Sequence, residues 1–133
     1  AEDHIKTYND HDLDRLVTFW QDKQTGLERR EFQKNLWLAA FPDTHMEVIS
    51  MTAQDDRVVV EAIVRATHAG PLNMWVKHPI PATNKKIEFP YCSVGQYKNG
   101  KLVELRTYID IFNILDQLGI AEQVNSGQQF WPD

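Results

Sequence analysis

The spacing of apolar residues changes at Pro42, and this change constrains the fold more than any other feature of the chain. Before Pro42, apolar side chains recur every three or four residues, as on one face of a helix. After Pro42 they alternate with polar side chains, as along a strand that is buried on one side. Helices grouped ahead of strands predict an α+β domain with an antiparallel sheet.

Two helices are predicted before Pro42. Asn9 or Asp10 is expected to cap the first, because such side chains accept hydrogen bonds from the amides of a first turn. Its apolar face is formed by Leu13, Leu16, Val17 and Trp20. The second helix is predicted over residues 27–41 and ends there because proline cannot continue a helix.

The rest of the chain predicts four strands and a short helix. Strands are expected over residues 46–51, 58–68, 88–97 and 102–109, with a helix from residue 111. Asn99-Gly100 predicts a two-residue hairpin turn, and Pro90 indicates a bulge or a sheet edge. The segment from residue 70 to residue 86 is long for a hairpin connection, so it is expected to be functional or mobile.

Length, charge and cysteine content exclude several other classes of protein. The 133 residues fit one domain with one core. A net charge of −5 without a basic stripe argues against nucleic-acid binding, and no apolar run approaches the ~20 residues that span a membrane. The one cysteine, Cys92, excludes a disulfide within the chain and suits a cytoplasmic protein. The aromatic pair Phe130-Trp131 is expected to dock on this domain or on a partner.

Six short motifs along the chain occur in the order found in one protein family. They are YNDHDLD (8–14), AAFPD (39–43), THAG (67–70), PATNKKIEF (81–89), NGKLVE (99–104), and YID with LDQLG (108–110 and 115–119). On these motifs the chain resembles the SnoaL-like polyketide cyclases, a branch of the nuclear transport factor 2-like fold. The resemblance implies an α+β cone, in which a strongly curved antiparallel sheet and N-terminal helices enclose a pocket. It also implies a homodimer through the outer face of the sheet.

The sequence departs from the cyclases at three places. Thr107 stands where they carry the aspartate that serves as acid and base, and Ser93 stands where they can carry a pocket histidine. The segment 21–26 is shorter than the one that lines the pocket mouth in relatives, which implies a more open cone or a segment missing from this sequence. Ring-closing aldol chemistry is therefore only one of the activities that the resemblance implies.

Two residues are candidates for acid/base catalysis. Asp110 follows the last strand among apolar neighbours, which would partly desolvate its carboxylate and raise its pKa towards the range of a general base. The same position predicts a helix cap, and both roles can coexist. His68 ends the longest strand on its apolar side, where it would act as acid, base or hydrogen-bond donor, or be an ordinary core histidine.

Seven residues are candidates for the lining of the pocket. Tyr91, Ser93 and Thr107 carry hydroxyl groups that could orient a ligand or stabilise an oxyanion, or simply bond to one another in the core. The aromatic candidates, which could equally be ordinary core, are Trp37, Phe41, Trp75 and Phe89. No metal and no cofactor is expected, because the histidines lack the spacing of metal ligands.

Three functions remain open from the sequence. The first is an enzyme that acts by acid/base chemistry on a hydrophobic, carbonyl-bearing small molecule, as in aldol cyclisation or isomerisation. The second is a module that binds an apolar small molecule without chemistry, which the loss of the aspartate at Thr107 favours. The third is a dimerisation or interaction domain whose sheet face carries the partner site; Arg65 and Glu61 lie on that face.

Overall fold

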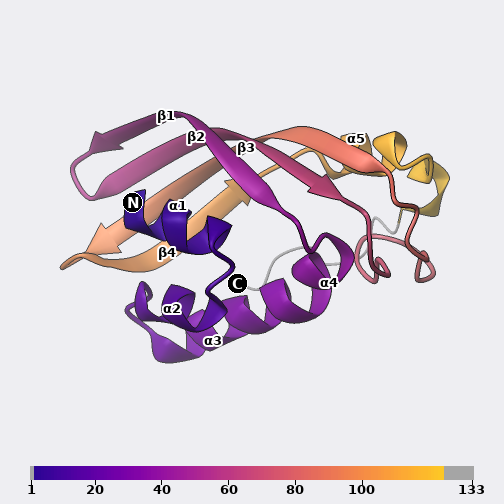
Figure 1. Ribbon diagram of the computed structural model, residues 1–133. Helices are drawn as coiled ribbons and strands as arrows, with labels where there is room; N and C mark the ends of the chain where they lie inside the picture. The colour runs from indigo at the N-terminus through magenta and orange to yellow at the C-terminus, as the bar shows by residue number, and fades with distance from the viewer. Residues whose placement is uncertain (1, 125–133) are drawn as a thin grey trace.

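The computed structural model describes residues 2–124, so the predicted docking of Phe130-Trp131 lies outside the described residues. One antiparallel sheet has the strand order β1-β2-β3-β4 (Figure 1). Its strands are β1 (His45–Gln54), β2 (Arg57–Thr67), β3 (Lys86–Lys98) and β4 (Lys101–Tyr108). The predicted α+β class is confirmed, whereas the strong curvature of the sheet stays a prediction.

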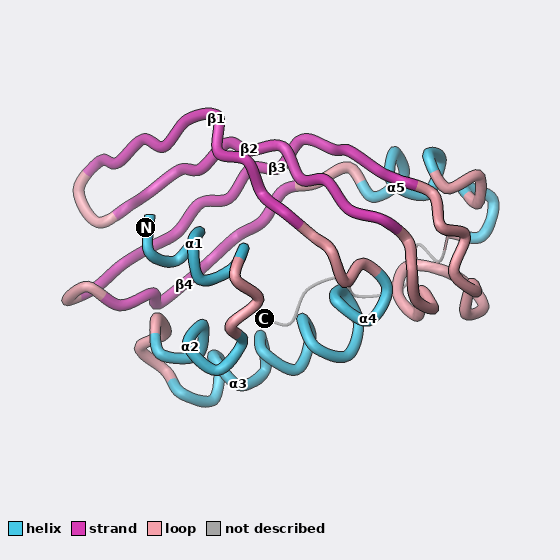
Figure 2. Tube along the Cα trace, in the orientation of Figure 1, coloured by secondary structure: helices cyan, strands magenta, loops and turns pink. Residues whose placement is uncertain are grey.

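The helices of the N-terminal third lie together on one face of the sheet, and the other face is open in Figures 1 and 2. They are α1 (Glu2–Asn9), α2 (Leu13–Thr18), α3 (Lys23–Phe32), the π-helix η1 (Gln33–Trp37) and α4 (Leu38–Ala40). Two further helices follow the sheet, α5 (Ile111–Gln117) and the 3₁₀-helix η2 (Ala121–Gln123). Within residues 2–124, we find no helix with the length and apolar character that crossing a membrane requires.

The predicted cap of the first helix is wrong. Asp12 caps α2, where its carboxylate accepts a hydrogen bond from the amide of Arg15 at 3.2 Å. Asn9 instead ends an earlier helix, α1, and its side chain exchanges two hydrogen bonds with the backbone of Met46, at 2.8 and 2.9 Å. The Asn9 side chain therefore joins α1 to β1. Local sequence does not reveal this contact, because asparagine near a helix end is usually read as a cap.

The second helix begins earlier than predicted and is not uniform. Asp22 caps α3 through the amide of Thr25 at 3.1 Å, so the helix starts at Lys23 and not at residue 27. The helix changes to π geometry at Gln33–Trp37. Segments of π-helix are rare in proteins, and many of those known lie at functional sites. The first turn of α3 is mostly polar, and therefore apolar periodicity does not detect it.

The long connection between β2 and β3 belongs to the core. Leu72, Met74 and Trp75 are at most 1% exposed, and Leu72 and Ile80 exchange backbone hydrogen bonds at 2.9 and 3.0 Å. This burial gives the connection a structural role, which the prediction of a functional or mobile segment did not include.

Two turn-forming signals have different outcomes. The hairpin at Asn99-Gly100 is confirmed, since both residues have the positive φ of a type I′ turn, at 52° and 79°. The bulge predicted at Pro90 is wrong, because the register of β3 with β2 is unbroken there. The edge is confirmed, because β4 ends at Tyr108, opposite Cys92, and does not reach Pro90.

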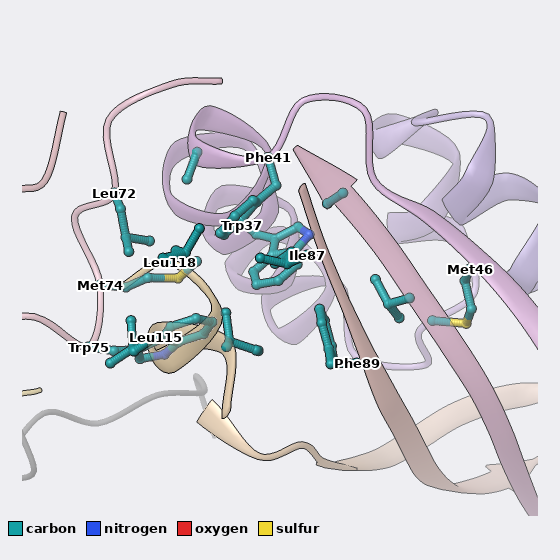
Figure 3. Close-up of a cluster of buried hydrophobic side chains, with 14 of the residues drawn as sticks. Trp37, Phe41, Met46, Leu72, Met74, Trp75, Ile87, Phe89, Leu115 and Leu118 are labelled. Carbon is teal, nitrogen blue, oxygen red and sulfur yellow. The ribbon is translucent and has the colours of Figure 1, made fainter. Parts of the chain in front are cut away.

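The core lies between the sheet and the helices, and Trp37 lies near its centre (Figure 3). The Trp37 ring is 4.6 Å from that of Phe41, 5.7 Å from Trp75 and 5.9 Å from Phe89, measured between centroids. Its indole nitrogen donates a hydrogen bond of 2.9 Å to the Thr44 hydroxyl. The core therefore ties η1 to the sheet and to the buried connection.

Candidate functional site

A cavity of about 120 Å³ lies between the inner face of the sheet and the helices α1 to η1. Apolar side chains make up most of its wall, among them Trp20, Phe32, Trp37, Val60, Val64 and Phe89. Pockets for drug-sized ligands usually measure roughly 300–1,000 Å³, and an engineered cavity of about 150 Å³ in another protein holds benzene. The size of this cavity therefore suits a compound of about one ring.

A cluster of hydroxyl groups lies on the strand side of the cavity. Tyr91, Ser93 and Thr107 all line it, and Ser93 faces Thr107 directly across β3 and β4. Burial raises the pKa of Tyr91, while hydrogen bonding from Ser93 and Thr107 and the positive charge of Arg29 oppose that rise. The Tyr91 phenol is therefore protonated at neutral pH and can donate a hydrogen bond.

A second tyrosine reaches the same part of the cavity from α1. Burial raises the pKa of Tyr8 well above its usual range, and the nearby phenol of Tyr91 raises it further. A hydrogen bond with Trp37 acts in the opposite direction. Sequence reasoning found Tyr8 only as the first residue of a motif, because the helix that carries it was not predicted.

Positive charge enters the cavity from α3. Arg29 lines it, with its guanidinium 5.2 Å above the Trp20 ring and its Nη2 donating to the Leu105 carbonyl at 3.2 Å. Arg30 also lines it, while its two terminal nitrogens pair with Asp14 and Glu31 at 3.0 and 3.3 Å. No aspartate or glutamate occurs among the lining residues within the described chain. The charged lining is therefore cationic.

His4, on α1, is a titratable group of the cavity that the sequence did not single out. Its ring stacks on Phe19, with centroids 5.1 Å apart and planes 13° from parallel. Burial lowers the pKa of His4 from 6.5 to about 4. The imidazole is therefore neutral at neutral pH and can accept a proton.

The lowered pKa of His4 predicts a loss of stability in mild acid. The unfolded chain binds this proton more tightly than the folded one, so stability is complete above pH 6.5 and falls as the pH drops towards about 4. We expect His4 to account for a loss of about 2 kcal/mol between pH 7 and pH 5. Urea unfolding at both values should show a smaller loss for His4→Gln than for the wild type. An exposed control, His78→Gln, should behave as the wild type, and equal losses in all three proteins would contradict this prediction.

Asp110 lies outside the cavity, and the prediction that its carboxylate is desolvated is wrong. The residue is exposed, and its carboxylate caps α5 by accepting a hydrogen bond from the Asn113 amide at 3.0 Å. The apolar neighbours Ile109 and Ile111 are partly buried, because the chain turns into α5 at this point and leaves Asp110 in solvent. The structure therefore supports the cap.

We expect Asp110→Ala to lower the free energy of unfolding by about 1 kcal/mol, the usual cost of losing a helix cap. Asp110→Asn should keep most of that stability, since asparagine caps helices well. Chemical denaturation measures both variants. If Asp110→Asn and Asp110→Ala lowered the free energy of unfolding equally, the stabilising contribution of Asp110 would come from its charge and not from its hydrogen bond as a helix cap.

Three other predicted site residues are core residues that do not line the cavity. His68 is fully buried after β2, and its Nδ1 accepts a hydrogen bond from the Thr83 amide at 3.2 Å. Burial lowers the pKa of His68, an effect that the backbone of Gly70 opposes. Phe41 and Trp75 are also fully buried. Of the four predicted aromatic residues, only Trp37 and Phe89 line the cavity.

Comparison with known proteins relates this fold and cavity to one family. The family model of the SnoaL-like polyketide cyclases matches residues 2–118, and no curated protein matches the chain. Similar solved structures include AclR, a candidate hydroxylase from Streptomyces galilaeus (26% identity, TM-score 0.70, covering 87% of this chain and 76% of AclR). A SnoaL-like polyketide cyclase from Agrobacterium tumefaciens has 19% identity and a TM-score of 0.68, covering 87% of this chain and 92% of its own. IdmH, a candidate polyketide cyclase from Streptomyces antibioticus, has 21% identity and a TM-score of 0.67, covering 90% and 98%.

Proposed function

This chain belongs to the SnoaL-like polyketide cyclase family, and from that premise we propose that it binds a small, largely apolar carbonyl compound in the cavity. The observation that carries the proposal is the cluster of Tyr91, Ser93 and Thr107 in a largely apolar wall. Buried hydroxyl groups that converge on one region orient a ligand through its polar atom, while the apolar wall supplies affinity.

The carbonyl oxygen of the ligand would accept a hydrogen bond from the Tyr91 phenol. The pKa of Tyr91 is raised by burial, so the phenol keeps its proton at neutral pH and donates. Arg29 places positive charge near the same phenol. A positive charge and a hydrogen-bond donor in a water-poor site both stabilise negative charge that develops on a carbonyl oxygen.

Acid/base catalysis is the second candidate function, and His4 is the observation that favours it. A neutral imidazole in the cavity wall could remove the proton from the carbon next to the carbonyl, as the electron pair moves to the carbonyl oxygen. The resulting enolate is the intermediate common to aldol cyclisation and isomerisation. We propose His4 as the base because Asp110 lies outside the cavity and Thr107 cannot serve unaided.

Cyclohexanone is a suitable probe, since it has one ring, a carbonyl and exchangeable α-protons. We expect it to bind the wild type in an NMR titration and to exchange its α-protons with deuterium faster than in buffer. His4→Gln should bind it equally but lose the exchange. If the wild type binds cyclohexanone without faster exchange, the catalytic candidate fails and ligand binding alone remains. If it does not bind cyclohexanone, the proposed function is overturned. His45→Gln, an exposed histidine on β1, is the control.

We also propose a homodimer through the open face of the sheet. Ile49 and Tyr108 are 62% and 56% exposed there, and together with Ile63 and Pro90 they line a shallow groove. Arg65 bonds to Glu88 across β2 and β3 on the same face, at 2.8 Å. Exposed apolar groups of this kind often mark protein interfaces.

Native mass spectrometry tests the proposed homodimer. It should give twice the chain mass for the wild type and the mass of one chain for Ile49→Lys. A wild-type monomer would contradict the proposal.

A further inference from the structure

Two polar atoms in the cavity wall are buried and have no hydrogen-bond partner within residues 2–124. They are the side-chain oxygen Oε1 of Gln33 and the side-chain nitrogen Nε of Arg30, and both residues line the cavity. The other two guanidinium nitrogens of Arg30 are engaged by Asp14 and Glu31. Buried donors and acceptors are nearly always satisfied in native proteins, so this pair calls for a partner from beyond the described residues.

The backbone holds the two side chains next to each other. Arg30 lies near the end of α3, and Gln33 caps it with helical φ and ψ of −62° and −47°. Residues three apart on a helix are neighbours on the same face. Gln33 also opens the π-helix η1, and such turns are frequent at functional sites.

The chemistry of the pair favours a partner that both donates and accepts a hydrogen bond. The Gln33 oxygen accepts a hydrogen bond, whereas the Arg30 Nε–H group donates one. A hydroxyl group does both at once. A carboxylate could satisfy only Arg30, an ammonium group could satisfy only Gln33, and a hydrocarbon could satisfy neither.

We propose that Gln33 and Arg30 together bind a hydroxyl group of the ligand. The ligand hydroxyl donates to Gln33 Oε1 and accepts from Arg30 Nε, so the natural ligand is a compact ring compound that carries a hydroxyl as well as the carbonyl proposed above. This inference rests on the proposed function, because it requires that the cavity holds a small ligand.

Phenol and toluene separate the two ideas, because they have nearly the same size and differ in one hydroxyl. In NMR titrations, the wild type should bind phenol about tenfold more tightly than toluene, the usual effect of one good hydrogen bond in a buried site. Gln33→Met should lose this preference, with toluene affinity unchanged. Gln24→Met makes the same substitution on the exposed side of α3 and should leave both affinities unchanged.

Each alternative outcome has a separate meaning. If Gln33→Met still prefers phenol as strongly as the wild type, the pair does not bind the hydroxyl and this inference is wrong, while the cavity keeps its proposed function. If the wild type binds neither compound, the proposed function fails and this inference fails with it. Gln33→Glu retains a hydrogen-bond acceptor, so it should keep the preference for phenol. If Gln33→Glu lost this preference, that result would also count against the inference.

Discussion

We expect Gly70→Ala to lower the free energy of unfolding by about 3 kcal/mol. The added methyl group would clash with backbone atoms, and no flexible side chain could move aside to relieve the clash. A Cβ atom at Gly70 would lie 1.9 Å from the carbonyl oxygen of Ala39. The amides of Ala69 and Gly70 both donate to the carbonyl of Ala40, at 3.1 and 3.2 Å. Any shift that relieves the clash therefore weakens the bonds that join the end of α4 to the segment after β2. Urea unfolding measures the effect.

Gly100→Ala is the matched control for this substitution. A Cβ atom at Gly100 meets nothing within 4 Å, and the only penalty is the positive φ of 79°. That conformation costs an alanine about 1 kcal/mol. If Gly70→Ala were no more destabilising than Gly100→Ala, the close approach of the two backbones would not be a feature of the folded protein.

The strands and the face that each presents could be predicted from the sequence. A strand has a period of two, so the hairpin at Asn99-Gly100 together with the alternation along β3 and β4 fixes which side chains share a face. The family resemblance then implied that the face with Tyr91, Ser93 and Thr107 points inward, and all three line the cavity. Local rules therefore give the register, whereas the direction of the face came from the resemblance.

The helical side of the cavity could not be predicted in the same way. His4, Arg29 and Gln33 are polar residues on helices, and polar helical residues usually face solvent. Their direction depends on where α1 begins and where η1 departs from α-helical geometry, and neither has a clear local signal. Tertiary contacts such as the bonds from Asn9 to Met46 set these positions instead.

Asp110 and Trp75 show a second limit of sequence reasoning. A carboxylate between a strand and a helix has the same local pattern whether it caps the helix or faces a cavity, and only its exposure in the folded chain separates the two. A buried aromatic residue likewise has the same pattern in a core and in a cavity wall. Trp75 is completely buried, yet it does not line the cavity.

We expect Trp37→Ala to lower the free energy of unfolding by about 4 kcal/mol, the typical cost of removing a large buried aromatic side chain. Trp37 is 4% exposed and packs between Phe41 and Phe89 (Figure 3). The substitution also removes its hydrogen bond to Thr44. Urea unfolding measures the change, and Phe112→Ala is the control, since Phe112 is 57% exposed and should change stability by less than about 0.5 kcal/mol.

The same substitution links the core to the cavity, because Trp37 belongs to both. The space left by the indole would join the existing cavity of about 120 Å³ and should admit a two-ring compound such as naphthalene. A ligand that binds only the folded state raises the free energy of unfolding by RT ln(1 + c/Kd), where c is the free ligand concentration, so the gain grows with the logarithm of that concentration. Naphthalene should therefore recover part of the stability that Trp37→Ala loses and have little effect on the wild type. Equal effects on both proteins would show that Trp37 does not limit the size of the ligand.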